Sequence, residues 1–264
     1  MSPLFTVIVT THLRGHLLAR ALASLRAQTF QDFEVIVVAD ALDHGTAQAC
    51  AEWLRPQDQF LKRSGKPGPA ESRNVGLRLA KGEWILYLDD DDTHEPFCLA
   101  NFAAAIQAHG QAHPVLFTDL EVVHERRSPS GVEFLRKETV PLGHVPLAQA
   151  YLKNFIPNNV LAFRRSVLEG IEVDTHLASL EDWDFLLAVM ARATPAHFAG
   201  GGPIVHKDEN AATHRGGSEA ATNDTVVLDY LHIYRRWPAP HDVIREHRHG
   251  LLKSVGLDLP KHWF

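Results

Sequence analysis

Four consecutive aspartates, Asp89 to Asp92, stand directly after a short apolar run in this chain of 264 residues. The run at residues 84–88 has the length of one buried strand and is too short to cross a membrane. Neighbouring carboxylates repel one another, so folding alone gives little reason to place four together. A divalent cation would relieve the repulsion, and side chains at i and i+2 of an extended chain can point to the same side. The pattern predicts a cation site, with a solvated acidic turn as the alternative.

The residues before and after the acidic run alternate between strand and helix patterns. Runs rich in apolar and β-branched residues predict strands at residues 5–10, 33–38, 60–62 and 84–88. Apolar residues at helical spacing predict helices at residues 17–28, 47–54, 71–79 and 97–108. This alternation predicts βαβ units, and therefore an α/β fold with a mostly parallel central sheet flanked by helices.

Polar residues follow three of these predicted strands. Thr10 and His12 come at the end of the first strand, Asp40 follows the second, and Asp89 and Asp91 follow the strand at residues 84–88. Because ligands of open α/β sheets bind at the carboxyl ends of the strands, we expect these residues to form a nucleotide site. The chain has no G-x-G-x-x-G after its first strand and no G-x-x-x-x-G-K-[ST], so neither a dinucleotide enzyme nor a P-loop enzyme is supported.

The composition excludes several other classes of protein. A chain with 45% hydrophobic and 22% charged residues has the balance of an ordinary globular protein. The net charge of −6 argues against a nucleic-acid partner. Cys50 and Cys98 are two widely separated cysteines, so we expect a reduced, cytoplasmic compartment. We expect no signal peptide, and no apolar run is long enough to span a membrane.

The regular alternation stops after residue 110, and the second half of the chain is less regular. We expect strands at residues 115–118 and 160–163, with residues 121–123 extending or pairing with the first, and a turn at residues 128–131. Ser179 is the expected N-cap of a helix that Pro195 ends, and residues 226–237 predict an amphipathic helix. Residues 206–219 are polar without periodicity and predict irregular structure.

Several short motifs together resemble the inverting glycosyltransferases of family 2. They occur in that family's order and at its spacings, over roughly residues 4–190. The matching segments are residues 5–12, 28–30, 33–38 with Asp40, 72–77, 82–92 and 181–184. The resemblance implies a GT-A (nucleotide-diphospho-sugar transferase) fold. It also implies inverting transfer of a sugar from a nucleoside-diphosphate sugar to an acceptor hydroxyl.

The resemblance places the nucleotide-sugar site at Thr10, His12, Asp40 and Arg73. His12 stands where the family often has an aromatic ring stacked on the base. Asp40 matches an acidic residue that hydrogen-bonds the base, and a carboxylate can accept from the N3–H of uracil, which favours a UDP-sugar. The family often has two acidic residues here, whereas this chain has Ala39 in the first position. Arg73 matches an arginine that faces the donor.

The same resemblance makes the acidic run a metal-binding D-x-D motif. Asp91 is the expected direct metal ligand, and Asp89 is expected near the ribose or a metal-bound water. Asp90 is in register with a nucleotide-contacting position of some relatives. The cation is expected to be Mn²⁺ or Mg²⁺, which hard carboxylates suit. His214 is the expected further ligand, with His206 as the competing candidate.

The segment Glu181-Asp182-Trp183-Asp184 resembles the motif that carries the family's catalytic base. Asp182 is the expected general base, which removes a proton from the acceptor hydroxyl. Glu181 and Asp182 could instead cap the helix and interact with its dipole. Asp184 is a second candidate base that fits the motif less well.

Other classes of protein fit parts of the pattern. Residues 89–93 also satisfy the D-x-D-x-[TV] motif of haloacid-dehalogenase-type phosphatases. There Asp89 would be the nucleophile and Asp91 the acid/base, with Mg²⁺ between them. That motif usually follows the first strand of its domain, whereas two strand–helix units precede it here. A non-catalytic sugar-nucleotide binder is a further alternative. In the glycosyltransferase interpretation, Asp92 belongs to the turn.

We divide the chain into a GT-A domain at residues 1–220 and a C-terminal helical tail at residues 221–264. Residues 1–120 are expected to be the nucleotide-sugar-binding half of that domain, and residues 121–220 the acceptor half. Position alone suggests four acceptor-binding candidates, which are Asn158, Asn159, Arg164 and Arg165.

The resemblance also implies an acceptor and a setting. We expect a saccharide or lipid-linked acceptor in the synthesis of cell-surface polysaccharide or lipopolysaccharide. The tail, which carries Arg245, Arg248 and Trp263, is expected to cap the sheet. Its alternatives are peripheral contact with the inner face of the membrane and formation of a homodimer.

Overall fold

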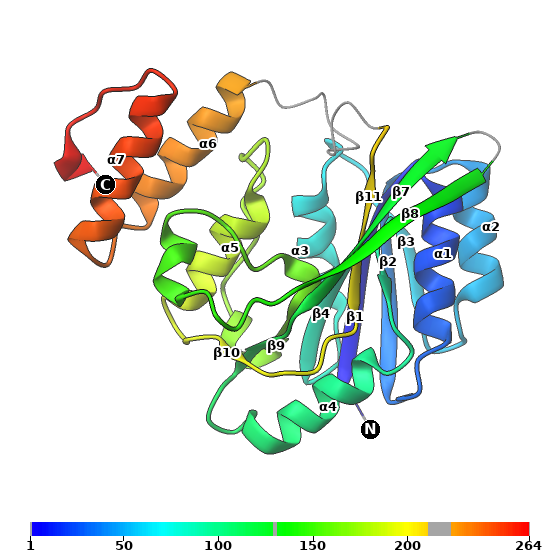
Figure 1. The fold of residues 1–264 in the computed structure, drawn as a ribbon. Helices are drawn as coiled ribbons and strands as arrows, with labels where there is room; N and C mark the ends of the chain where they lie inside the picture. The colour runs from blue at the N-terminus through cyan, green and yellow to red at the C-terminus, as the bar shows by residue number, and fades with distance from the viewer. Residues whose placement is uncertain (1, 129–130, 211–222, 264) are drawn as a thin grey trace.

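A seven-stranded sheet forms the centre of the protein, with strand order β10-β6-β9-β4-β1-β2-β3 (Figure 1). The structure, a computed structural model, describes residues 2–128, 131–210 and 223–263. The strands are β1 (Phe5–His12), β2 (Phe33–Ala41), β3 (Gln59–Lys62), β4 (Trp84–Asp89), β6 (Val115–Phe117), β9 (Leu161–Arg164) and β10 (Ala196–His197). β9 is antiparallel to both of its neighbours, and the other pairs are parallel. The predicted mostly parallel sheet is therefore confirmed.

Helices cover both faces of this sheet. Apolar residues of α1 (Gly15–Arg26), α2 (His44–Trp53) and α4 (Cys98–His109) pack on one face. Those of α3 (Pro69–Leu79) and α5 (Glu181–Met190) pack on the other. The helices predicted from apolar spacing are therefore present, with bounds that differ by a few residues.

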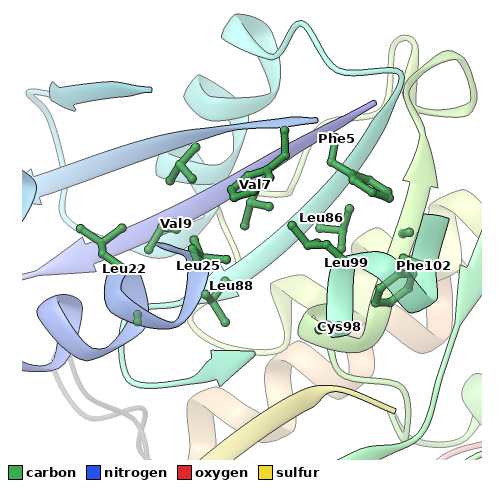
Figure 2. Packing of buried hydrophobic residues seen from close by; sticks show 14 of the residues in the cluster. Phe5, Val7, Val9, Leu22, Leu25, Leu86, Leu88, Cys98, Leu99 and Phe102 are labelled. Atoms are coloured by element: carbon green, nitrogen blue, oxygen red, sulfur yellow. The ribbon is translucent and has the colours of Figure 1, made fainter. Parts of the chain in front are cut away.

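The alternation of side chains along β1 divides the core between the two faces. Phe5, Val7 and Val9 point, with Leu86 and Leu88 of β4, toward α1 and α4 (Figure 2). Ile8 lies in the cluster on the opposite face. Both faces are buried, which explains why these strands have continuous apolar runs rather than alternating ones.

A second, four-stranded sheet has the order β5-β11-β7-β8. Its strands are β5 (Thr93–His94), β7 (Leu120–Ser128), β8 (Gly131–Val140) and β11 (Pro203–Asp208). In Figure 1 the β7–β8 hairpin passes in front of the central strands. β8 was not found in the sequence analysis because its residues are mostly exposed and its apolar residues do not alternate regularly with polar ones. The prediction of irregular structure is wrong for residues 206–208, which belong to β11 and pair in parallel with β7.

The last two helices, α6 (Asn223–Arg236) and α7 (Asp242–Ser254), lie on the α5 side of the molecule (Figure 1). Trp183 of α5 packs in one buried cluster with Tyr234 of α6 and Leu252 of α7. The guanidinium of Arg248 is buried and donates to the carbonyl of Tyr151 at 2.8 Å. Tyr151 ends the short 3-10 helix η1 (Leu147–Tyr151). The described part of the tail therefore packs against the domain, and none of the described helices is long and apolar enough to span a membrane.

Candidate active site

The carboxyl edge of the central sheet, where β1, β2 and β4 end, brings together the residues expected to hold a nucleoside. Thr10 is paired with Asp89 across β1 and β4, which fixes the register of this edge. His12 Nδ1 lies 2.5 Å from Asp40 Oδ1. The other oxygen of Asp40 accepts from the backbone N–H of Gly68 at 2.6 Å. The sequence-predicted residues Thr10, His12 and Asp40 therefore lie at one edge, as parallel strands require.

Arg63, which the sequence analysis did not single out, holds the loop that closes this edge. Its Nε donates to Ser72 Oγ at 2.8 Å, and its Nη2 donates to the carbonyl of Gly68 at 2.7 Å. Gly68 has φ of 147°, which an L-residue rarely adopts. Arg63 follows directly after β3 at the same edge as Asp40. Its place after a strand was the signal that could have identified it.

The four aspartates occupy four different environments. Asp89 and Asp91 are accessible, with 44% and 25% of their side chains exposed. Asp90 is fully buried against Arg14, whose Nε donates to Asp90 Oδ2 at 3.2 Å. Burial raises the pKa of Asp90 to about 6, although the charge of Arg14 opposes that shift. Contact of Asp90 with a nucleotide, as expected from the resemblance, would require its side chain to leave Arg14.

Asp92 belongs to the turn, as expected, because its N–H donates to the carbonyl of Asp89 at 3.1 Å, and its side chain makes further contacts. Its carboxylate is buried and accepts from Asn159 Nδ2 at 3.0 Å and from the backbone N–H of His206 at 3.0 Å. Burial, together with the charges of Asp91 and Asp89, raises its pKa well above the ordinary value. Asp92 therefore ties the end of β4 to β11 and to the short 3-10 helix η2 (Asn158–Val160).

The two accessible carboxylates suit a divalent cation. Asp89 and Asp91 offer hard oxygen ligands, and Mg²⁺ sites commonly use one or two carboxylates completed by substrate phosphates. Within the described ranges no group of three or more His, Cys, Asp or Glu side chains could hold a metal by itself. His206 has both ring nitrogens engaged, at 3.0 Å from Glu125 Oε2 and 2.8 Å from Thr93 Oγ1. His214 lies outside the described residues.

Arg73 connects the acidic run to the segment at the start of α5. It is 5% exposed, and its Nη2 donates to Asp89 Oδ1 at 3.0 Å. Its Nη1 donates to Glu181 Oε1 at 2.6 Å, across a separation of 108 residues. The two motifs that the sequence singled out are therefore joined by one guanidinium.

Asp182 lies beside this bridge at the first turn of α5. Its Oδ2 accepts from Asn154 Nδ2 at 3.1 Å, and its Oδ1 accepts from the backbone N–H of Trp183 at 2.8 Å. Burial, with the neighbouring charge of Glu181, raises the pKa of Asp182 to about 6, and Arg73 opposes this. A carboxylate with this pKa is ionised at pH 7 and basic enough to accept a proton from a reacting hydroxyl. Asn154 was not found from the sequence, because only the fold brings it here.

The start of α5 differs from the prediction. Ser179 is not the N-cap, because its N–H and hydroxyl both donate to Asp229 Oδ2 of α6, at 2.7 and 2.9 Å. The N-cap is Leu180, with φ of 62°. Among the described residues, the non-glycine residues with positive φ are Leu180 and Leu13. Leu180 precedes Glu181, and Leu13 lies between His12 and Arg14, so both strained positions adjoin candidate site residues.

The competing base, Asp184, faces away from the acidic run. Its Oδ1 accepts from Trp237 Nε1 at 2.7 Å, and its Oδ2 accepts from Arg236 Nη1 at 3.1 Å. Burial raises its pKa. Asp184 therefore anchors α6 and the residue that follows it, which leaves Asp182 as the carboxylate turned toward the site.

The acceptor candidates divide between the two edges of the sheet. Arg164 is paired with Trp84 at the start of β4 and donates to Glu83, so it lies at the edge opposite Asp89. Arg165 lies at the same edge, because its backbone N–H donates to the carbonyl of Glu83. Both arginines therefore lie away from the acidic run, because β9 runs antiparallel to β4.

Asn158 and Asn159 lie at the carboxyl edge, since η2 packs against β4. Asn158 is 6% exposed, and no described protein atom hydrogen-bonds its side-chain amide. A buried polar group without a partner is costly, so ligand or water is expected to satisfy it.

Comparison with known proteins identifies relatives that share most of the chain. The model of a family described as Glycosyl transferase family 2 matches residues 6–171. An uncharacterized glycosyltransferase of Haemophilus influenzae is 28% identical over 235 residues, which are 86% of this chain and 76% of that protein. Succinoglycan biosynthesis protein ExoO of Rhizobium meliloti is 29% identical over 203 residues, 72% of this chain and 56% of that protein.

Solved structures share the fold. TarS of S. aureus, crystallised in complex with UDP-GlcNAc, superposes with a TM-score of 0.69 at 22% identity, over 94% of this chain and 71% of that one. The mannosyltransferase PcManGT of Pyrobaculum calidifontis, in complex with GDP-Man and Mn²⁺, gives 0.58 at 18% identity, over 99% and 78%. At these identities the similarity concerns the fold alone.

Proposed function

Since the chain belongs to glycosyl transferase family 2, we propose that it transfers a sugar from a UDP-sugar to an acceptor hydroxyl, with inversion at the anomeric carbon. The observation that carries the proposal is the bridge made by Arg73, which joins Asp89 to Glu181 beside Asp182. One guanidinium thereby connects the candidate donor site to the candidate base. Family membership also removes the reason to keep the phosphatase interpretation, and the paired D-x-D and Asp182 argue against a non-catalytic binder.

The nucleoside end of the donor is assigned to β1 and β2. Asp40 can accept from the N3–H of uracil, because a carboxylate offers about four lone-pair positions and only two are occupied here. His12, on Asp40, is positioned to stack on the base, and Thr10 lies beside them at the end of β1. The complex of TarS with UDP-GlcNAc supports uridine, whereas the GDP-Man complex of PcManGT keeps guanosine as the competitor.

Asp89 and Asp91 would hold Mn²⁺ or Mg²⁺ together with the diphosphate oxygens of the donor. Bound there, the ion would act as a Lewis acid that offsets the charge developing on the departing diphosphate. Two accessible carboxylates and an incoming diphosphate make a reasonable ligand set for either cation. The Mn²⁺ in the complex of PcManGT supports the choice. His214 stays a proposal for a further ligand.

Asp182 is the proposed general base. Asn154 and the N–H of Trp183 hold its carboxylate in one orientation. The acceptor hydroxyl gives its proton to Asp182 as its oxygen attacks the anomeric carbon, on the face opposite the leaving diphosphate. Attack from that face inverts the configuration. A positioned base of this kind contributes about 10²–10⁴-fold to the rate.

The acceptor is proposed to be a saccharide or a lipid-linked saccharide of cell-surface polysaccharide synthesis. The succinoglycan protein ExoO supports that class, and the chain spans only 56% of it. Residues 1–120 would bind the donor and residues 121–220 the acceptor. Docking of the tail on a membrane or on a second copy remains a separate proposal.

A thermal-shift screen against nucleoside diphosphates and their sugars, with and without Mn²⁺, tests the function. We expect UDP and a UDP-sugar to raise the melting temperature, and the Mn²⁺-dependent part of that rise to vanish in Asp91→Ala. NMR of the anomeric proton in the product then reports inversion. Absence of any shift with UDP plus Mn²⁺ would overturn the proposal, and a retained configuration would overturn the inverting mechanism.

A further inference from the structure

Arg14, at the end of β1, lies across two members of the acidic run. Its Nη2 is 2.5 Å from Asp90 Oδ1, and its Nε donates to Asp90 Oδ2 at 3.2 Å. Its Nη1 donates to Asp91 Oδ2 at 3.3 Å. Asp90 is fully buried, whereas the Arg14 side chain is 28% exposed. One end of the guanidinium is therefore anchored on Asp90, and the other reaches an accessible carboxylate.

Asp91 is surrounded by further positive charge. Arg127 Nη1 of β7 lies 3.7 Å from Asp91 Oδ2, and Arg127 is itself held by Glu125 at 2.7 Å. Arg20 donates to the backbone carbonyl of Asp91 at 2.8 Å. A divalent cation that approaches Asp91 in this state meets guanidinium groups already paired with its ligand. A cation that binds Asp91 in the nucleotide-free protein must therefore displace Arg14 from this carboxylate, which costs free energy.

The diphosphate of the donor reverses this balance. A cation shared between Asp91 and phosphate oxygens takes the carboxylate away from Arg14 Nη1. That N–H then faces a phosphate, which guanidinium groups bind with strong, charge-assisted hydrogen bonds. Asp90 keeps the rest of the group in place, so Arg14 changes partner without leaving the site.

We propose that Arg14 couples the two ligands: it pairs with Asp91 in the empty site and with the donor's diphosphate when Asp91 binds a divalent cation. The inference rests on the proposed function. Because such coupling is reciprocal, Mn²⁺ strengthens the binding of UDP by the same factor as UDP strengthens the binding of Mn²⁺. In this protein the buried Asp90 is then a positioning residue for Arg14 rather than a nucleotide ligand.

Mn²⁺ titrations followed by electron paramagnetic resonance, with calorimetry of UDP at zero and saturating Mn²⁺, test the coupling without an activity assay. In Arg14→Gln we expect Mn²⁺ alone to bind about 3–10-fold more tightly, because a competing charge is gone. We expect UDP with Mn²⁺ to bind about tenfold more weakly, because a phosphate contact is lost. The factor by which UDP strengthens the binding of Mn²⁺ should therefore be smaller in this variant than in the wild type.

Two further variants keep the result interpretable. Arg14→Gln alone leaves Asp90 buried and unpaired, which can destabilise the fold. The double variant Arg14→Gln, Asp90→Asn replaces the ion pair by two amides. Because it removes a negative charge as well as a positive one, we expect a smaller gain in Mn²⁺ affinity and the same loss in the affinity for UDP with Mn²⁺. Arg164→Gln removes an arginine at the opposite end of β4, where it pairs with Glu83, and should match the wild type in both affinities.

The possible outcomes separate the two proposals. A wild-type protein that binds neither UDP nor Mn²⁺·UDP overturns the proposed function and this inference with it. A wild-type protein that binds both, with unchanged Mn²⁺ and UDP affinities in the double variant, overturns the inference alone. Tighter Mn²⁺ binding combined with weaker Mn²⁺·UDP binding supports it.

Discussion

Two buried polar side chains, Glu34 and Asn158, lie at opposite ends of the central sheet and differ in their hydrogen-bond partners. At the amino edge, where β1, β2 and β4 begin, buried Glu34 accepts from Thr6 Oγ1 and from the N–H of Lys81, both at 2.7 Å. At the carboxyl edge, Asn158 is equally buried, and no described protein atom hydrogen-bonds its amide. Glu34 therefore has two hydrogen-bond donors within the chain, whereas the amide of Asn158 has no partner among the described residues.

Three of the ion pairs at these edges also differ in exposure. Near the amino edge Arg55 and Asp58 are both buried, and Asp58 accepts from Arg55 Nε at 2.9 Å and from the N–H of Val35 at 2.8 Å. At the carboxyl edge Arg73 and Arg14 pair with Asp89 and Asp91, whose side chains remain accessible. Ion pairs that stay open to solvent can exchange partners, whereas enclosed ones hold the fold together.

The largest expected effect is on Asp182. In Asp182→Asn we expect transfer to fall about 10²–10⁴-fold, because an amide cannot take the acceptor's proton. UDP affinity, measured by calorimetry, should stay within about twofold, since Asp182 is proposed to act on the acceptor and not to hold the donor. Near wild-type transfer by this variant would show that Asp182 is not the base.

Asp91 and Glu83 compare one carboxylate at each end of β4. In Asp91→Asn we expect the Mn²⁺-dependent affinity for UDP to fall about 10–100-fold, because a charged metal ligand is lost. In Glu83→Gln, which removes an exposed partner of Arg164 at the amino edge, we expect no change. Equal losses in the two variants would remove the distinction between the edges.

The rate should depend on pH through Asp182. Its pKa of about 6 lies above the ordinary value of 3.8, so the protonated, inactive form accumulates below pH 6. We expect kcat to fall about tenfold per pH unit on that side. In Asn154→Ala, loss of a donor to the carboxylate should raise this pKa further and move the acid limb to higher pH. A pH–rate profile that is the same in both proteins would contradict the assignment.

The raised pKa of Asp182 also affects the stability of the fold. Ionisation of Asp182 increases the expected rate but lowers the free energy of unfolding. Because the folded protein binds this proton more readily than the unfolded chain, ionised Asp182 destabilises the fold above pH 6, and the cost disappears as pH falls toward 4. We expect the free energy of unfolding of Asp182→Asn to exceed that of the wild type by about 1 kcal/mol at pH 8. The variant should therefore melt at a higher temperature at pH 8, and the difference should vanish near pH 4. Melting curves at the two pH values decide this.

The smallest effects come from the uncharged polar groups at the two edges. In Asn158→Leu we expect the ligand-free protein to gain about 1 kcal/mol, because a buried amide without a described partner is removed. In Thr6→Val we expect a loss of about 1–2 kcal/mol, because Glu34 loses a donor. Denaturant unfolding measures both, and equal signs would break the comparison.

Much of the fold of residues 1–110 could be predicted, because its signals are local. Parallel strands buried on both faces have continuous apolar runs, and the residue after each run falls at the carboxyl edge. The positions of Thr10, Asp40 and Asp89 followed from that rule. β8 and β11 could not be predicted, since an exposed hairpin and a polar strand lack the apolar alternation on which such predictions depend.

The start of α5 marks a second limit. Ser179 has the right chemistry for an N-cap, but its hydroxyl donates to Asp229, a residue of the C-terminal helices. Leu180 takes the N-cap position in a strained conformation that no sequence rule favours. At both Ser179 and Leu180, tertiary contacts outweigh the local preference of the residue for a capping position.

The sequence by itself determined that this chain carries a strand ending in carboxylates, a family 2 pattern of motifs and an acidic helix start, because these are properties of neighbouring residues. Only the tertiary structure decided that Asp90 is buried on Arg14 while Asp91 stays accessible, and that Arg73 joins the two motifs. Arg14 and Asp90 are 76 residues apart, and Arg73 and Glu181 are 108 apart. Identical side chains next to each other acquire different roles from such distant partners, because burial and opposing charge are set by the fold.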